Sequence, residues 1–229
     1  MTVQEILQRL ESLGTPENIA GMARYGIKTE KAFGVSAPEL KKLAKEIGRH
    51  HALALALWAT KVHEARAVAY LIDNPQQVSP AQMDDWAADF DNWAICDGTC
   101  GHLFRRTPFA YEKAFDWAER EEEFVRRAGI VLMASLAVHD KKADDAKIER
   151  FLPFLEKHSD DERNFVKKSV NWALRQIGKR SIYLNKKAIA TGNRIKAGNT
   201  KSARWIASGA LRELKSEKIQ KRLQEKLLK

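Results

Sequence analysis

Residues 161–178 read DERNFVKKSVNWALRQIG, and this stretch indicates the fold most directly. Its apolar residues recur at intervals of three and four, which is the spacing of one face of an α-helix. That face consists of Val166, Val170, Ala173, Leu174 and Ile177. Trp172 falls nearly opposite and lines up with three basic residues, Lys168, Arg175 and Lys179. The sequence therefore predicts an amphipathic helix whose outer stripe combines one tryptophan with three cations.

The same spacing recurs along the chain, between residues that cap and start helices. A serine or threonine, whose side-chain oxygen can cap the free amides of a helix start, stands just before a proline suited to the first helical turn. The three cases are Thr15 with Pro16, Ser36 with Pro38 and Ser79 with Pro80. We expect twelve to fourteen short helices and no convincing strand. Their approximate ranges are 3–13, 16–25, 37–48, 51–61, 63–73, 80–89, 92–105, 108–119, 122–138, 143–157, 161–178, 181–194, 200–214 and 216–228.

Short helices joined by short loops favour an all-α solenoid of the HEAT-like or armadillo-like kind, in which each helix pair buries its apolar face against its neighbours. We expect residues 1–229 to form a single domain of this type, because this length lies near the upper limit of one domain. The sequence shows no clean repeat period. An ordinary globular bundle of helices therefore remains the alternative fold.

The net charge of +10 is concentrated near the C-terminus, with −4 over residues 1–160 and +14 over residues 161–229. Such polarity, with a pI of about 9.6, predicts binding to a phosphate backbone, although solvated lysine-rich helix faces are the alternative explanation. The longest apolar stretch, residues 52–59, is too short to cross a bilayer, and the first six residues do not resemble a secretory signal. We expect a cytoplasmic protein, associated with the nucleoid when it is bound to DNA, with no membrane partner.

The two cysteines, Cys96 and Cys100, lie four residues apart on one expected helix. With His102 they form a loose cluster that lacks a fourth metal ligand, and helix packing accounts for small buried thiols. We expect neither a disulfide framework nor a metal site.

Two further segments depart from ordinary helix packing. Trp93 and Asp97 share a helix face in a segment rich in small residues, which suggests a surface that another molecule approaches closely. Tight helix crossing is the structural alternative. Arg126 and Arg127 precede an apolar run that looks buried, so a carboxylate or a phosphate must pair with them. Asp97 is the first partner to test, and a plain structural ion pair is the alternative interpretation. For Trp172 the alternative interpretation is packing under a neighbouring repeat.

These segments occur in the order found in a known family. The order of three motifs resembles that of the AlkD-type DNA alkylation-repair glycosylases: Trp93 with Asp97, then Arg126-Arg127, then Trp172 with Arg175. The upstream segments 22–25 (MARY) and 33–40 (FGVSAPEL) also resemble the N-terminal region of that family. The resemblance covers about residues 20–180 and, more loosely, the C-terminus.

The resemblance implies a HEAT-like glycosylase that excises purines alkylated at N3 or N7 from duplex DNA, with no metal or nucleotide cofactor and no obligatory protein partner. Asp97 would be the catalytic carboxylate, Trp93 and Trp172 would hold the deoxyribose, and Arg127 would hold the adjacent backbone. Tyr25 would line the same groove, with Lys168, Arg175 and Lys179 as further DNA contacts. Ala94 departs from the family, whose members often have an acidic residue there.

Two other classes of function stay open from the sequence alone. A paralogue that binds DNA or RNA without cleaving it would use the same groove, but the complete set of tryptophans, aspartate and arginine argues against it. A protein-binding helical scaffold is the second class, because many solenoids bind partners along one face. The basic C-terminal third makes a scaffold less attractive.

Overall fold

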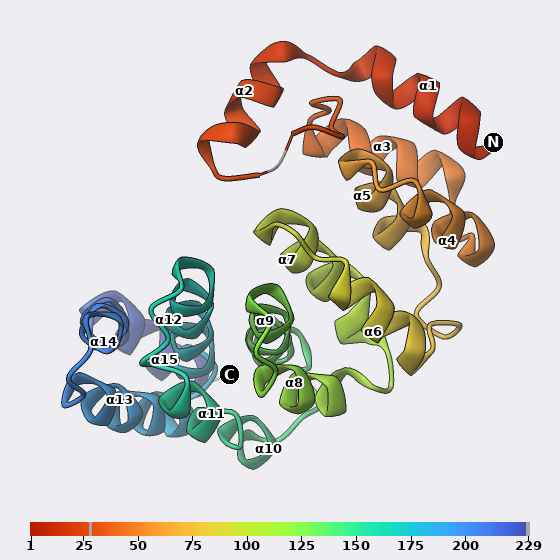
Figure 1. Cartoon of the computed structure of the whole chain (residues 1–229). Coiled ribbons are helices and arrows are strands. Elements are labelled where there is room, and N and C mark those ends of the chain that lie inside the picture. The colour runs from red at the N-terminus through yellow and green to blue at the C-terminus, as the bar shows by residue number, and fades with distance from the viewer. Residues whose placement is uncertain (28, 228–229) are drawn as a thin grey trace. The chain divides into compact units, whose positions relative to one another are not determined.

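The computed structural model describes residues 1–27 and 29–227, and its regular elements in those ranges are all helical. In chain order (Figure 1) they are α1 (Val3–Leu13), α2 (Pro16–Arg24), α3 (Ala37–Ile47), α4 (His51–Ala59), α5 (His63–Ile72), α6 (Pro80–Ala88), α7 (Trp93–His102), the 3₁₀ helix η1 (Phe104–Arg106), α8 (Ala110–Ala118), α9 (Glu123–His139), α10 (Asp145–Glu149), α11 (Leu152–Lys157), α12 (Asn164–Gly178), α13 (Ile182–Lys196), α14 (Lys201–Leu214) and α15 (Glu217–Leu227). The all-α prediction is confirmed.

Side-chain caps set many of the helix starts. The hydroxyls of Thr15 and Ser79 accept hydrogen bonds from the amides of residues 18 and 82, as their pairing with proline predicted. Ser36 occupies the predicted cap position of α3, but its side chain makes no capping hydrogen bond. The predicted positions of these three helix starts are therefore correct, although only two of them use the expected hydroxyl cap.

Two predicted helices have different bounds in the structure. The range 143–157 contains two helices, α10 and α11, because Pro153 has no amide hydrogen and its ring would clash with the carbonyl of Glu149 in a continuous helix. The helix expected from residue 161 begins at Asn164. Asp161 instead accepts a hydrogen bond from the amide of Arg163, whose backbone is extended. Residue 228, at the end of the last predicted range, lies outside the described residues.

Residues 1–110 form one compact unit, and the chain from residue 111 onward forms a second. In the first unit α5 is central and packs against α1, α3, α4 and α7. The rings of Trp58 on α4 and Trp86 on α6 stack at 3.9 Å and help to close this core. The prediction of one cooperative domain over the whole chain stays a prediction.

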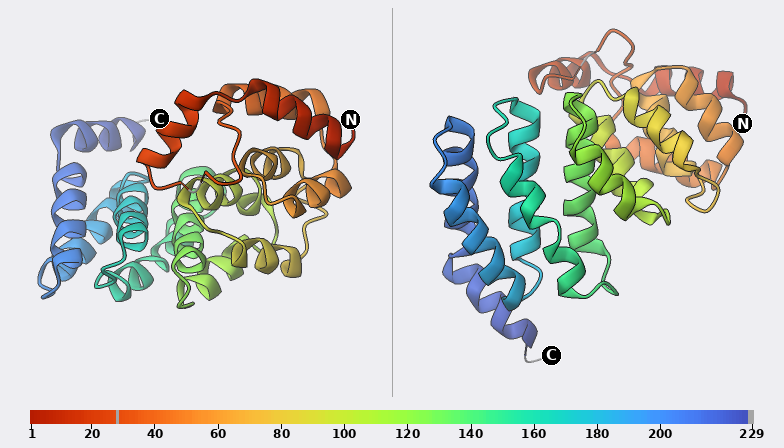
Figure 2. Two further views of the ribbon diagram at one scale, coloured as in Figure 1. Left: turned by 45° about the horizontal axis from the view of Figure 1, so that its top comes forward. Right: turned by 60° about the horizontal axis from the view of Figure 1, so that its bottom comes forward.

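In the second unit α12 is central and packs against α9, α13 and α14 (Figure 2). The apolar face of α12 predicted from the sequence is fully buried, with no exposed surface on Val166, Val170, Ala173, Leu174 or Ile177. Helices α8 and α9 approach closely at Gly129, where a β-carbon would lie 2.4 Å from the backbone nitrogen of Ala118. None of the described helices combines the length and apolar character needed to cross a membrane.

Candidate nucleic-acid interface

The start of α7 fixes the position of Trp93, the first residue of that helix. The buried side chain of Asn92 caps α7, and its oxygen accepts hydrogen bonds from the amides of Ala94 and Ile95 at 3.0 and 3.1 Å. Because the cap holds the first turn in place, the orientations of Trp93 and of Asp97 one turn later are tied to this loop.

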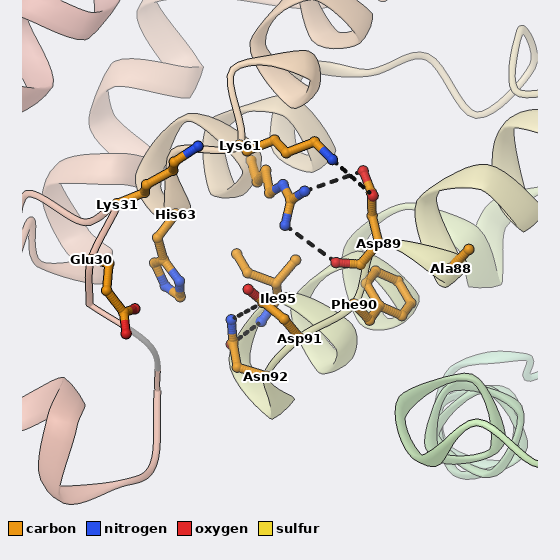
Figure 3. Close-up of a pocket in the computed structure, with 11 residues that line it drawn as sticks. Glu30, Lys31, Lys61, His63, Ala88, Asp89, Phe90, Asp91, Asn92 and Ile95 are labelled. Carbon is orange, nitrogen blue, oxygen red and sulfur yellow. Dashed lines mark hydrogen bonds and ion pairs between the residues drawn. The ribbon is translucent and has the colours of Figure 1, made fainter.

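A cavity of about 400 Å³ lies beside this loop in the first unit (Figure 3). On its wall the carboxylate of Asp89 pairs with Arg66 at 3.1 Å and with Lys61 at 3.5 Å, and it also accepts a hydrogen bond from the indole of Trp58. Three basic side chains, those of Lys31, Lys61 and Arg66, line the cavity together with three acidic ones, those of Glu30, Asp89 and Asp91. The contacts of Arg66 on α5 with the carboxylate and the backbone carbonyl of Asp89 hold the loop before α7 against α5.

Trp93 and Tyr25 lie together in the first unit. The indole nitrogen of Trp93 donates a hydrogen bond of 3.0 Å to the backbone carbonyl of Tyr25. The Tyr25 side chain is 72% exposed, whereas Trp93 and Asp97 are half-buried. The structure therefore brings Tyr25, Trp93 and the turn that carries Asp97 to one place, with an accessible phenol ring at its edge.

The small residues of α7 divide into two kinds. At Gly98 a β-carbon would lie 2.4 Å from the hydroxyl oxygen of Tyr70 on α5, a phenol whose burial raises its pKa to about 12. At Gly101 nothing lies within 4 Å of a β-carbon. Gly98 thus serves helix packing, as the structural alternative for this segment predicts, whereas packing does not explain Gly101. Cys96 and Cys100 are both fully buried on α7.

We expect alanine at these two glycines to have opposite effects on stability. Gly98→Ala forces the buried Tyr70 ring to move and should lower the free energy of unfolding by about 1–3 kcal/mol. Gly101→Ala adds a methyl group in open space to a helix and should raise it by up to about 1 kcal/mol. Urea denaturation of both variants measures the difference. Equal stability of the two would contradict the packing role of Gly98.

In the second unit Arg127 is buried on α9, with 6% of its surface exposed. Its guanidinium donates a hydrogen bond of 2.5 Å to the backbone carbonyl of Phe165 on α12. This bond orients the guanidinium toward α12. The pairing of Arg127 with Asp97 stays a prediction.

The neighbouring Arg126 has a different partner from the one the sequence suggested. Its guanidinium pairs at 2.9 Å with Asp161, which also pairs with Arg163 at 2.5 Å. Burial by itself would raise the pKa of the Asp161 carboxyl, but hydrogen bonds from Arg163 and Arg126 outweigh this effect and lower the pKa to about 2. The cluster ties the start of α12 to α9, the two helices that carry Trp172 and Arg127.

The outer stripe of α12 is only partly as predicted. Trp172 is half-buried and Lys168 is exposed, which fits a position away from the apolar face. Arg175 and Lys179, however, both form ion pairs with Glu213 on α14, and the distance from the Lys179 nitrogen is 2.7 Å. One carboxylate shared by two cations leaves a net charge of +1. Among the three basic residues, Lys168 is the most accessible to a phosphate.

Trp205 is a further candidate, beyond the residues predicted from the sequence. It is 48% exposed on α14, and the Lys167 ammonium lies 5.8 Å from the centre of its ring. Like Trp172, Trp205 lies away from the apolar face of its helix, because it falls opposite the buried residues Ala203, Ile206 and Ala207. An exposed ring beside a cation suits stacking on a base or a sugar.

The two units differ in charge, with −1 over residues 1–110 and +11 over residues 111–229. The second unit therefore holds all of the excess positive charge, together with Trp172 and Trp205. This distribution is suited to attracting a polyanion such as a nucleic-acid backbone.

The described residues 1–27 and 29–227 form packed helices and no sheet, which places the chain in the class of all-α helical-repeat proteins. The family model described as DNA alkylation repair enzyme matches residues 6–214. The chain therefore belongs to the DNA alkylation repair enzyme family, as the resemblance implied.

The chain is also similar to a solved structure described as "A new family of proteins related to the HEAT-like repeat DNA glycosylases with affinity for branched DNA structures". The two share 22% identity with a TM-score of 0.80, over 97% of this chain and 96% of the other. This match confirms the HEAT-like repeat fold. The comparison with curated proteins gives no match.

Proposed function

We propose that the protein is a DNA glycosylase that hydrolyses the N-glycosidic bond of purines alkylated at N3 or N7 in duplex DNA. The observation that carries this proposal is the placement of Trp93 and Asp97 one turn apart on a capped helix, beside the exposed ring of Tyr25. Membership of the DNA alkylation repair enzyme family supports the choice of substrate.

The proposed chemistry needs few groups, because an alkylated purine already carries a positive charge and leaves readily. As the bond from C1′ of the sugar to the purine nitrogen breaks, its electron pair neutralises the departing base and cationic character moves to the sugar. The Asp97 carboxylate and the indole faces of Trp93 and Trp172 stabilise that cation more strongly than they stabilise the ground state. A water oxygen then bonds to C1′, and Asp97 accepts or directs its proton.

In this proposal Arg127 positions the DNA backbone beside the lesion. Its guanidinium, held by the Phe165 carbonyl, binds the phosphate next to the lesion. Ala94, the half-buried neighbour of Trp93, makes the site less acidic than in relatives with a carboxylate there.

A second candidate function is DNA binding without base release. It is favoured by the structural neighbour, whose description names affinity for branched DNA and no excision. Such a protein would use the basic second unit and the exposed ring of Trp205 while its α7 residues served only packing.

Base release separates the two candidate functions. The protein is incubated with methylated duplex DNA, and free 3-methyladenine and 7-methylguanine are quantified by chromatography. A glycosylase releases base in proportion to protein and time, whereas a binder retards the DNA, and branched DNA more strongly, without releasing base.

A further inference from the structure

A second cavity, of about 460 Å³, lies wholly within the second unit, near the C-terminal ends of α9, α12 and α15. Five basic side chains line it together with one acidic one, Asp145. The basic residues are Lys141, Lys179, Arg180, Arg222 and Lys226. In contrast to the cavity beside α7, its wall carries a large excess of positive charge.

Two of these cations already serve the fold. Arg180 donates hydrogen bonds to the carbonyls of Ala137, Asp140 and Ala143 at the end of α9, and it also pairs with Asp145 at 3.4 Å. Lys179 pairs with Glu213. Both acidic partners are therefore engaged, and neither offers a full negative charge to the remaining cations.

The other three cations converge on the cavity without an acidic partner. The Lys226 ammonium donates hydrogen bonds to the carbonyls of Lys179 and Arg180 at 3.1 and 3.4 Å, which leaves one of its three hydrogens for another acceptor. Within the described part of the chain, the side chains of Lys141 and Arg222 form no ion pair and no hydrogen bond. Burial lowers the pKa of the Lys226 ammonium, and Arg222, Lys141 and Arg180 lower it further by repulsion. An anion in the cavity would relieve this repulsion.

The lining indicates which anion fits. It contains no aromatic ring on which a base would stack, and its apolar part is limited to Ala137 and Val138. Charge-assisted hydrogen bonds from Lys and Arg are instead suited to the oxygens of a phosphate.

The position along α12 suggests where that phosphate belongs. Lys179 lies seven residues after Trp172 on nearly the same helix face, which corresponds to about 10 Å along the axis. A DNA strand advances about 3.4 Å per nucleotide along the duplex axis, so a duplex that runs along α12 passes roughly three nucleotides over this distance. We propose that this cavity binds a backbone phosphate of the DNA strand whose sugar contacts Trp172, roughly three nucleotides from that sugar. The proposal rests on the proposed function, because Trp172 marks the lesion site.

The test combines a charge-removing variant with neutral phosphates in the DNA. Lys141→Gln with Arg222→Gln removes two cations that have no structural bonds, so its melting temperature should equal or exceed that of the wild type. The matched control is Lys186→Gln with Lys196→Gln, which removes the same charge from exposed positions on α13, a helix that lines no part of the cavity. Duplexes carry one tetrahydrofuran abasic analogue and one methylphosphonate, placed one to six nucleotides to either side.

We expect the wild type and the control to lose affinity about five- to tenfold when the methylphosphonate lies roughly two to four nucleotides from the analogue on one side. The Lys141/Arg222 variant should bind the parent duplex correspondingly more weakly and show no further loss at that position. Its slope of log affinity against log salt should be about one unit shallower than that of the wild type.

Equal sensitivity of the variant and the wild type at every position would overturn the proposal. A second result would overturn the assignment to DNA and leave a site for a free anion. In that result no methylphosphonate position changes the affinity, and inorganic phosphate raises the melting temperature of the wild type but not that of the variant. Failure of the proposed function is seen in a different measurement, the release of base from methylated DNA. If the affinities follow the predicted dependence on methylphosphonate position but no base is released, the phosphate site is retained and the glycosylase is excluded.

Discussion

Asp97→Asn is expected to slow single-turnover release of an alkylated purine by on the order of 10²-fold or more. Asparagine keeps the shape of the side chain on α7 but removes the negative charge that opposes the developing cation on the sugar. Because the carboxylate acts mainly in the transition state, affinity for duplex DNA should change little. Any change should be a gain in affinity, since repulsion between Asp97 and phosphate is relieved. Rapid-quench measurement with enzyme in excess gives the rate, and fluorescence anisotropy gives the affinity.

The control for this variant is Arg127→Ala. In the catalytic account it impairs DNA engagement, because the guanidinium oriented by the Phe165 carbonyl no longer meets the backbone. If Asp97 and Arg127 instead form only a structural ion pair, each substitution leaves the other charge buried, and both variants lose several degrees of melting temperature. A base-release rate of Asp97→Asn near that of the wild type would exclude Asp97 as the catalytic group.

Glu64→Ala is expected to lower the free energy of unfolding by about 4 kcal/mol. Glu64 is 1% exposed, and its carboxylate accepts hydrogen bonds from the backbone amides of Phe33, Gly34 and Val35 at 2.9, 2.7 and 3.3 Å. Alanine leaves three amides without acceptors in the segment between α2 and α3. Chemical denaturation followed by circular dichroism measures the change.

Glu64→Gln is the matched variant. Its single carbonyl oxygen can still serve the amides of Gly34 and Val35, which share one carboxylate oxygen, but its amino group faces the amide of Phe33. We therefore expect the free energy of unfolding of Glu64→Gln to lie between that of the wild type and that of Glu64→Ala. A loss below about 1 kcal/mol for Glu64→Ala, or equal losses for both variants, would show that these bonds do not hold the segment.

Much of the fold follows from local signals in the sequence. The apolar spacing of α12 predicted its buried face, and the cap pairs Thr15-Pro16 and Ser79-Pro80 predicted where α2 and α6 begin. The break between α10 and α11 was also predictable, because Pro153 excludes a continuous helix, but the spacing of apolar residues alone conceals it.

The candidate site was less predictable, because its details depend on contacts between distant helices. The pairing of Arg175 and Lys179 with Glu213 arises only when α14 packs beside α12. The pairing of Arg126 with Asp161 likewise depends on how α9 meets the turn before α12. Trp205, in contrast, departs from its helix's apolar face as clearly as Trp172 does, and helical periodicity alone would have identified it.

A protein that cleaves glycosidic bonds at alkylated purines must release free base from alkylated DNA. The most direct test incubates the wild-type protein with a methylated duplex and counts both free bases and abasic sites in the DNA. We expect 3-methyladenine or 7-methylguanine to appear far faster than in buffer, with one abasic site for each base released. Duplex that is bound by the protein but loses base no faster than in buffer would contradict it.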